Sequence, residues 1–434
     1  MKFISTRDPS TRVTLSQAIA QGISSEGGLV IPESFPQFSI ADFDGANDLA
    51  NLAARLIAPF ARGDVLAGDL AEICRDAFNF PAPLVRLSGT PGPAYVLELF
   101  HGPTAAFKDF GARFLAASLE RIRKNAKRKL TILVATSGDT GGAVASAFFR
   151  RPWAQVGVLY PKGLVAPRQA QQLACWGENI HTLAVRGSFD ECQRMVKEAF
   201  RDPALQKSHE LSSANSINVG RLLPQMVYYA QASLQVWRDR GDKANFIIPS
   251  GNLGNATACI FAKLSGLPIG EIVLATNANR TVGDFLQSGD YQARRSVATI
   301  ANSMDVGNPS NMERLRALFP DIDALRLQVT ADSVSDEQIR ARIKLDRQSL
   351  GAIWCPHTAV AAEVYRRIAM IRSAVNKQWV IVSTAHPAKF NDIVEPLLGE
   401  KIPVPEALAK LLTLPRHESE IAATLDALRG GLPA

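Results

Sequence analysis

Short runs of apolar residues alternate along most of the chain with longer segments whose apolar residues recur at helical spacing. The runs at 129–136 and 244–250 each lead through a glycine-rich turn into a helical pattern, at 143–150 and 256–266 respectively. Similar short apolar runs occur at 155–161, 271–277 and 378–384. Strands that alternate with helices form a largely parallel sheet with helices on both faces. The pattern therefore predicts an α/β fold.

The first 80 or so residues have a different pattern. A short helix is predicted over 14–22, where Gly22 ends it, and the segment 24–38 that follows is rich in turn residues. Further along the chain there is neither an internal repeat of solenoid length nor a low-complexity linker. We therefore expect an N-terminal subdomain over 1–80, followed by a larger unit over 81–434.

The composition is that of an ordinary globular protein, with 434 residues of which 47% are hydrophobic and 21% are charged. A chain of this length can bury a large core. It has no stretch near the roughly 18 apolar residues that a spanning helix needs, and its start lacks the apolar segment of a signal peptide. We therefore expect a cytoplasmic protein that does not contact membranes.

The five cysteines are widely spaced, and no two of them form a C-x-x-C pair. An odd number of separated cysteines indicates neither a disulfide framework nor a zinc site, so we expect no metal. They are Cys74, Cys175, Cys192, Cys259 and Cys355.

The net charge of +7 favours an anionic ligand over a cationic one. The densest basic run, at 121–129, is the natural place to look for nucleic-acid binding. That run ends a predicted amphipathic helix, however, where cations complement the helix dipole. We therefore expect a solvated helix end there, and no nucleic-acid partner.

One lysine stands out because its neighbours are aromatic. In LFHGPTAAFKDFGARF, at 99–114, Lys108 lies between Phe107 and Asp109, and no Lys or Arg occurs in the ten residues before it. A poorly solvated amine loses its proton more readily, so its pKa is expected to fall and its neutral form to act as a nucleophile. Asp109 is predicted to cap a helix that begins at Phe110.

The turn after the run at 244–250 is suited to an anion. Gly251 and Gly254 bracket a polar loop that opens a helix, so backbone N–H groups and the positive end of the helix dipole point at one spot. Ser250, Asn252 and Asn255 add side-chain hydrogen bonds. The alternative is a tight turn without a ligand. The turn matches neither the P-loop nor the dinucleotide-binding pattern.

The turn after the run at 129–136, ATSGDTGGAV, offers hydroxyl groups and freed amides to a carboxylate or phosphate. Asp139 would repel such an anion unless its side chain is aimed elsewhere. The alternative is that Asp139 caps the following helix.

Lys108 and the turn at 250–255 are complementary. A neutral amine can hold an aldehyde as a Schiff base. When that aldehyde is pyridoxal phosphate (PLP), the protein must also bind a phosphate, and the turn has the form to do so. Together they indicate a PLP site.

These motifs together resemble the threonine synthase family, which has the tryptophan-synthase-β-like fold (PLP fold type II). The similarity extends in order over nearly the whole chain, and it covers the subfamily with a distinct N-terminal domain. Lys108 lies in its most specific segment. The other similar segments are SSEGGLVIPE, TSGDTGGAVASAF, SSANSINVGRLLPQ, PSGNLGNATA, NSMDVGNPSNMERL and STAHPAKF.

The resemblance implies a two-lobed core of mainly parallel sheets over 81–434, in which about 130–235 form a smaller, mobile lobe. It implies that Lys108 holds PLP and serves as base and acid at the substrate's Cα and Cβ. Thr384 would face the pyridine nitrogen. The cofactor phosphate would bind to Gly251, Asn252, Leu253, Gly254 and Asn255. The family commonly has Phe at the position of Leu253, which matters little for a loop that binds through backbone amides.

The activity implied is conversion of O-phospho-L-homoserine and water into L-threonine and phosphate, by a carbon–oxygen lyase that works as a monomer or homodimer. The substrate carboxylate would meet the loop of Thr136, Ser137, Asp139 and Thr140. A phosphate dianion prefers donors on cations. The candidates for the substrate phosphate are Lys162, Ser216, Asn218 and Arg221.

Three alternatives remain open. A hydrolase would use the histidines and Cys355, yet no nucleophile motif such as G-x-S-x-G accompanies them. A PLP-dependent lyase or amino-acid dehydratase would share Lys108 and the glycine loop. It would not need to recognise a substrate phosphate, so NSINVGR and MDVGNPSN favour the synthase. A non-catalytic phosphometabolite-binding module would not need an amine at Lys108. The histidines in question are His101, His357 and His386.

Overall fold

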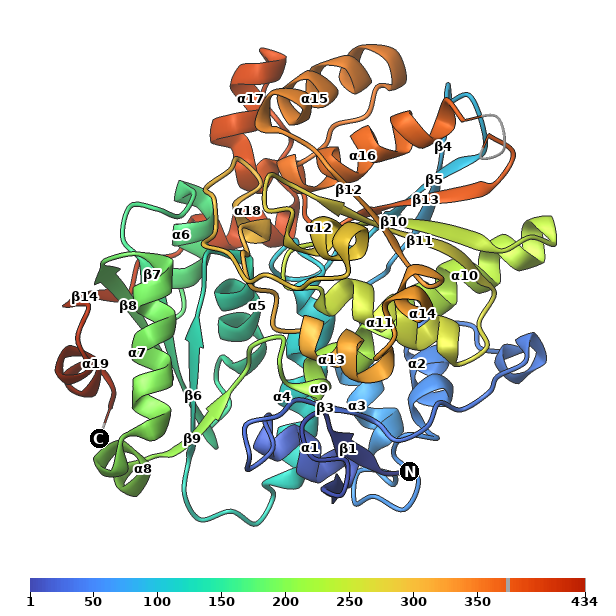
Figure 1. Ribbon diagram of the computed structural model, residues 1–434. Helices are drawn as coiled ribbons and strands as arrows, with labels where there is room; N and C mark the ends of the chain where they lie inside the picture. The colour runs from blue at the N-terminus through green and yellow to red at the C-terminus, as the bar shows by residue number, and fades with distance from the viewer. Residues whose placement is uncertain (372–374, 434) are drawn as a thin grey trace.

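The computed structural model describes residues 1–371 and 375–433. The larger of its two main sheets has six strands, all parallel except the last, which is antiparallel to its neighbour (Figure 1). In spatial order they are β12 (Thr330–Ser333), β11 (Ile269–Thr276), β10 (Ala244–Pro249), β13 (Gln378–Ser383), β5 (Ala94–Glu98) and β4 (Leu84–Leu87). The central strands are apolar runs buried on both faces, as a parallel sheet covered by helices requires.

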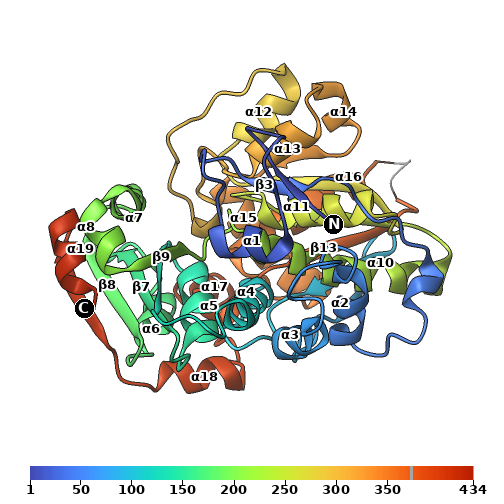
Figure 2. The same cartoon turned by 90° about the horizontal axis from the view of Figure 1, so that it is seen from below.

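The second main sheet has five strands and is parallel throughout. In spatial order they are β14 (Glu418–Ala422), β8 (Ile180–Arg186), β7 (Ala154–Pro161), β6 (Leu130–Ala135) and β9 (Glu210–Ser213). This sheet and its helices form the smaller lobe, at one side of the molecule in Figure 2. The C-terminal strand β14 pairs with β8, so the smaller lobe is not confined to 130–235 as expected from the sequence.

Nineteen helices and four short 3₁₀ turns connect the strands within the described residues. Those of the smaller lobe are α5 (Asp139–Phe148), α6 (Pro167–Ala174), α7 (Phe189–Arg201), α8 (Pro203–Ser208) and α19 (Leu425–Gly431). The helices from α9 onward outside the smaller lobe are α9 (Val219–Leu222), α10 (Met226–Arg240), α11 (Gly254–Leu264), α12 (Thr281–Ser288), α13 (Met312–Leu318), α14 (Ile322–Arg326), α15 (Asp336–Leu350), α16 (Pro356–Ala369), α17 (Asn391–Leu398) and α18 (Glu406–Leu412). Among these, α10, α11, α12 and α16 pack against strands of the larger sheet. The 3₁₀ turns are η1 (Ile40–Phe43), η2 (Leu223–Gln225), η3 (Asn302–Met304) and η4 (Pro387–Phe390).

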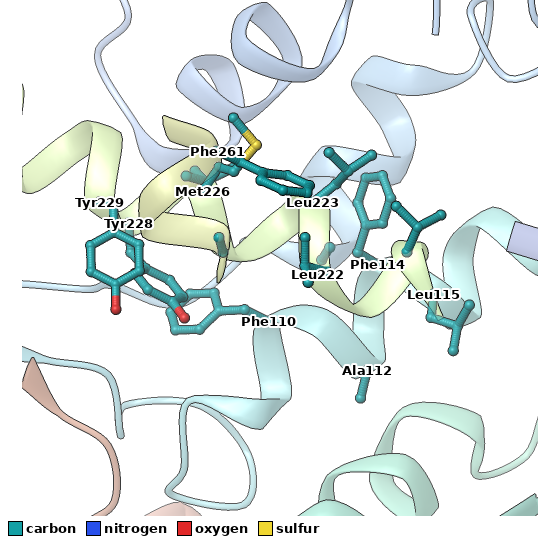
Figure 3. Packing of buried hydrophobic residues seen from close by; sticks show 14 of the residues in the cluster. Phe110, Ala112, Phe114, Leu115, Leu222, Leu223, Met226, Tyr228, Tyr229 and Phe261 are labelled. Atoms are coloured by element: carbon teal, nitrogen blue, oxygen red, sulfur yellow. The ribbon is translucent and has the colours of Figure 1, made fainter. Parts of the chain in front are cut away.

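Helix α4 (Lys108–Ile122) lies between the lobes and packs against α5 on one side and α9 on another. Its apolar residues join those of α9, η2, α10 and α11 in one core, which Figure 3 shows from close by. Phe110, Phe114 and Leu115 are fully buried there. Two arginines of the basic run at the end of α4 form ion pairs within the chain, as expected of a charged helix end. Arg121 pairs with Asp76, and Arg123 pairs with Glu210.

The N-terminal residues form an antiparallel sheet of β2 (Arg12–Val13), β1 (Phe3–Ser5) and β3 (Val30–Pro32), with helices α1 (Leu15–Gln21), α2 (Leu49–Ile57) and α3 (Leu70–Ala77). The predicted stop at Gly22 is confirmed, since this residue has a φ of 71° at the end of α1. Phe3 and Phe60 belong to the same apolar cluster as Phe110, so the N-terminal segment shares its core with the rest of the chain.

The predicted α/β fold with a mainly parallel sheet is confirmed, and each of the five apolar runs singled out in the sequence is a strand. No helix among the described residues is long and apolar enough to span a bilayer.

Candidate active site

Three turns meet at the carboxyl ends of parallel strands. One follows β6, one follows β10, and the third, at Thr384, follows β13. They face a cleft of about 1870 Å³, which Lys108 also lines. Open α/β sheets bind ligands at this edge, because strand ends and helix N-termini point polar backbone groups into it.

Lys108 is the first residue of α4 and lies partly buried in the cleft. The backbone before it is tied to the strand end that carries Thr384, since Phe107 N donates to Thr384 O at 2.9 Å. Desolvation is the largest cause of a fall in the pKa of the Lys108 amine to about 8; the charges of Arg221 and Lys389 contribute to this fall, and Asp139 opposes it. The expected fall in pKa is confirmed.

Asp109 does not cap the helix, which begins at Lys108, two residues earlier than expected. Its buried carboxylate accepts hydrogen bonds from Thr104 N at 2.8 Å and Thr104 Oγ1 at 2.6 Å. Gly102 also contacts this carboxylate so closely that a Cβ there would lie 2.5 Å from Oδ2. Asp109 therefore closes the loop that delivers Lys108 to the cleft.

The conformation of the turn between β10 and α11 is fixed by close packing and by hydrogen bonds to its neighbours. A Cβ on Gly251 would lie 2.8 Å from Met304 Cα, and Leu253 has a φ of 62°. The side chain of Asn252 accepts from Ser310 N at 2.5 Å and donates to Ser216 Oγ at 2.6 Å. The turn residues, including Gly254, line the cleft at the N-terminus of α11, where the first amides of a helix have no partner within it.

Asn255 has an oriented and unused donor. Its Oδ1 accepts from Tyr228 Oη at 2.5 Å and from Tyr229 Oη at 2.8 Å, while its buried Nδ2 has no partner among the described residues. A buried amide donor without an acceptor is costly, and a bound acceptor removes that cost. A phosphate on this turn would be such an acceptor.

The turn after β6 is shaped by the hydroxyl of Thr136. Its Oγ1 accepts from Gly138 N at 3.0 Å and Gly141 N at 2.9 Å, and it donates to Gly138 O at 3.0 Å. The Thr136 hydroxyl is therefore used within the turn and is not free for a ligand. Ser137 and Thr140 are partly exposed and line the cleft.

Asp139 is aimed away from an incoming anion. Its Oδ1 lies 2.8 Å from Lys389 Nζ and accepts from Gln169 Nε2 at 2.8 Å. Burial raises the pKa of Asp139, but the charges of Lys389 and Lys108 outweigh burial and lower it, so the group is a carboxylate. The alternative of a helix cap is wrong, because Gly138 is the cap residue and no side chain caps α5.

The four candidates for the substrate phosphate separate into two pairs. Arg221 and Ser216 line the cleft, and Arg221 is 2% exposed with its Nε unpartnered among the described residues. Lys162 is outside the lining residues, half-exposed and paired with Glu420. Asn218 is buried, caps α9 by accepting from Gly220 N at 2.9 Å and donates to Ile19 O at 2.9 Å. The structure therefore does not bring Lys162 and Asn218 to the cleft.

Comparison with known proteins agrees with this geometry. Residues 77–385 match the family described as pyridoxal-phosphate dependent enzyme, residues 2–78 match threonine synthase N terminus, and residues 358–430 match threonine synthase, C-terminal. The threonine synthase of Haemophilus influenzae is 39% identical over 100% of this chain and 99% of its own. The chain belongs to the threonine synthase family.

Solved structures of threonine synthases superpose over the whole chain. The Escherichia coli enzyme does so with a TM-score of 0.89 and 38% identity, covering 99% of both chains. The PLP-bound threonine synthase from Brucella melitensis has a TM-score of 0.90 and 32% identity, and both chains are fully covered. The resemblance stated from the sequence motifs is therefore confirmed, together with PLP fold type II.

The residues of this threonine synthase family member fit PLP. Lys108 offers an amine with a lowered pKa, and Asn255 offers an unpartnered buried donor beside the glycine turn. The described residues contain no cluster of His, Cys, Asp and Glu suited to a metal ion.

The histidine-based alternative has no support in the site. His357 lines the cleft, but its Nε2 accepts from Ser303 N at 3.1 Å, and burial lowers the pKa of this imidazole to about 4. Burial likewise raises the pKa of the Cys355 thiol. A neutral buried thiol is a poor nucleophile.

Sequence reasoning missed Lys389, Tyr228 and Tyr229. Lys389 lies within STAHPAKF, from which only Thr384 was assigned a role. The two tyrosines lie on α10, and only the fold brings them to Asn255.

Proposed function

We propose that this chain converts O-phospho-L-homoserine and water into L-threonine and phosphate with PLP as cofactor. The observation that carries the proposal is the meeting of the Lys108 amine, the glycine turn after β10 and the hydroxyl-bearing turn after β6 in one cleft. Amine, phosphate and carboxylate sites are what a PLP enzyme acting on a phosphorylated amino acid requires.

The cofactor would be held at both ends by residues of the larger lobe. Lys108 would bind its aldehyde carbon, and the amides of Gly251–Asn255, with Asn255 Nδ2, would bind its phosphate. Thr384 would present a neutral hydroxyl to the pyridine nitrogen. Bound PLP supplies an electron sink for the charge released at Cα.

Lys108 would carry the protons. Once the substrate amine has replaced it on the cofactor, its free amine would remove the proton at Cα and then a proton at Cβ as phosphate leaves Cγ. It would deliver one proton to Cγ, which becomes the methyl group, and return one to Cα after water adds at Cβ. An amine with a pKa of about 8 is suited to both directions, because it accepts and releases protons near neutral pH.

The substrate's two anionic groups would meet different residues. Its carboxylate would bind Ser137, Thr140 and the amides at the start of α5, in the turn that Thr136 shapes. Its phosphate would bind the Arg221 guanidinium and Ser216. Arg221 is buried and forms no ion pair among the described residues, although the charge of Asp109 acts on it, so an anionic ligand would balance its charge.

Closure of the smaller lobe over the cleft would keep bulk water from a reactive unsaturated species. The substrate is a small phosphorylated amino acid, so the reaction needs neither a membrane nor a nucleic acid. We propose that the enzyme acts in the cytoplasm as a monomer or homodimer.

The test is a product balance. Purified protein with PLP and O-phospho-L-homoserine is expected to release phosphate and L-threonine in equal amounts, and K108A is expected to lose the activity by about a thousandfold. Phosphate release with a 2-oxo acid in place of threonine would indicate the lyase or dehydratase instead. No phosphate release from the PLP-loaded protein would contradict the proposal.

A further inference from the structure

A buried ion pair, of which Asp139 lines the cleft, has no role in the reaction proposed above. Lys389 Nζ lies 2.8 Å from Asp139 Oδ1, and the two side chains are 1% and 4% exposed. The same Nζ donates to Thr104 O at 2.7 Å. Lys389 therefore bonds at once to the turn after β6 and to the loop that leads into Lys108.

Two glutamines of α6 complete the cluster. Gln169 donates to Asp139 Oδ1 at 2.8 Å, and Gln172 donates to Thr104 O at 3.1 Å. Lys389 lies on η4, which follows β13 of the larger sheet, whereas Asp139 and the two glutamines lie on α5 and α6 of the smaller lobe. The cluster therefore joins the two lobes.

Stability alone does not explain such a pair. Removing two charges from water costs several kcal/mol per ion, and apolar side chains in their place are often as stable or more so. The pair does, however, stand beside a reactive amine. Asp139 and Lys389 both act on the charge of Lys108, in opposite directions.

The charged groups that act on Lys108 come from separate elements. Asp139 of α5 favours its protonated form, whereas Arg221 of α9 and Lys389 of η4 disfavour it. His357 of α16, close by, is uncharged near neutral pH because burial lowers its pKa to about 4. After Lys389, the charge that acts most strongly on the buried Asp139 carboxylate is that of Lys108 itself.

We propose that Lys389 is a positioning residue, which fixes the turn after β6 against the Lys108 loop and occupies Asp139 so that this carboxylate does not pair with Lys108. That a neutral Lys108 amine matters for catalysis rests on the proposed function. That Lys389 and Asp139 set the protonation of this amine does not depend on that function.

The test reads the amine directly in the full-length chain freed of PLP. Competitive acetylation with acetic anhydride between pH 6 and 10, followed by mass spectrometry of the Lys108 peptide, gives the midpoint at which this amine becomes reactive. Lys401, which is 92% exposed on its side chain, serves as reference amine in every sample. Cofactor binding is not needed, so failure of the proposed function would not affect this result.

In K389M the midpoint for Lys108 is expected to rise by about one pH unit or more, because Asp139 is then free to pair with it. D139N, which keeps the size of the side chain, is expected to lower it. The double variant K389M/D139N is expected to return to within about half a unit of the parent, since the two changes offset each other.

An unchanged Lys108 midpoint in folded K389M would overturn the proposal, as would a double variant that behaves like K389M alone. A purely structural ion pair would change thermal stability and leave the midpoint where it was. Should K389M fail to fold, D139N decides the question, because an unchanged midpoint there contradicts the proposal equally.

Discussion

Lys108 owes its low pKa to its burial and to the charges of Arg221 and Lys389, which together outweigh the opposing charge of Asp139. Its aromatic neighbours in the sequence correctly indicated poor solvation. Phe107 lies close, with its ring centroid 5.7 Å from the Lys108 Nζ. Asp139, Arg221 and Lys389 were beyond the reach of sequence spacing, because only folding brings them to the amine.

The pKa of Lys108 predicts how the PLP-free chain takes up the cofactor. Below pH 8 the amine is mostly protonated and unable to attack an aldehyde, so the capture rate is expected to rise about tenfold per pH unit from pH 6 and to level off above about 8. Stopped-flow absorbance with PLP measures this rate. A rate that stays flat from pH 6 to 9 would contradict the assigned pKa.

Asn255 is expected to contribute to PLP affinity through its unpartnered Nδ2. N255A should weaken PLP binding by about 1–3 kcal/mol, or roughly five- to 150-fold. Y228F/Y229F keeps the amide but removes the two hydroxyls that orient it, so an intermediate loss is expected. Equilibrium titration by fluorescence gives the affinities.

The matched control for these tyrosines is Y365F, which removes a buried hydroxyl whose partner is Gly92 O. Its PLP affinity should equal that of the parent.

Equal affinity of N255A and the parent would show that Asn255 does not contact the cofactor.

At the scale of elements, apolar runs predicted five interior strands of the two main sheets, missed the interior strands β5 and β8, and predicted none of the edge strands. β10 and β13 are buried throughout, and both were expected from the sequence. β9, β12 and β14 have polar sequences because each lies at the edge of its sheet, with one side unpaired. Edge strands need no continuous apolar run, so their sequences resemble loops.

Helix α4 brings Lys108 and Arg221 together through a glycine. A Cβ on Gly111 would lie 2.6 Å from the carbonyl oxygen of Arg221. Alanine normally stabilises a helix relative to glycine by about 1 kcal/mol, but here the clash should push α9 away and destabilise the protein by about 1–3 kcal/mol. Urea unfolding of G111A measures the loss.

Gly142 on α5 is the matched control for Gly111. A Cβ there would lie 3.7 Å from its nearest neighbour, an ordinary contact. G142A is therefore expected to be as stable as the parent or slightly more so. Equal stability of G111A and G142A would contradict the close packing of α4 and α9.

At the scale of the whole molecule, the chain ends by returning to the smaller lobe. After α18 the chain crosses to form β14 at the edge of the five-stranded sheet. Ile421 of β14 and Leu428 of α19 belong to the same apolar cluster of this lobe. This return could not be predicted from the apolar pattern, since β14 is polar and pairs with a strand more than 200 residues away. The mobility expected of this lobe stays a prediction.

Leu428 tests whether the lobes are energetically separate. It is fully buried, so L428A should cost about 2–5 kcal/mol in local stability and speed hydrogen exchange in β8 and β14. PLP affinity should change little, because the phosphate turn belongs to the other sheet. L414A, at a side chain that is 41% exposed, should leave exchange unchanged. A large loss of PLP affinity in L428A would show that the lobes are one unit.

The account depends most on Lys108 as the residue that holds PLP. Reduction of the PLP-loaded protein with borohydride, followed by peptide mapping, fixes the cofactor to the lysine that carries it. The account predicts a pyridoxyl group on Lys108 alone. A pyridoxyl group on another lysine, or none at all, would contradict it.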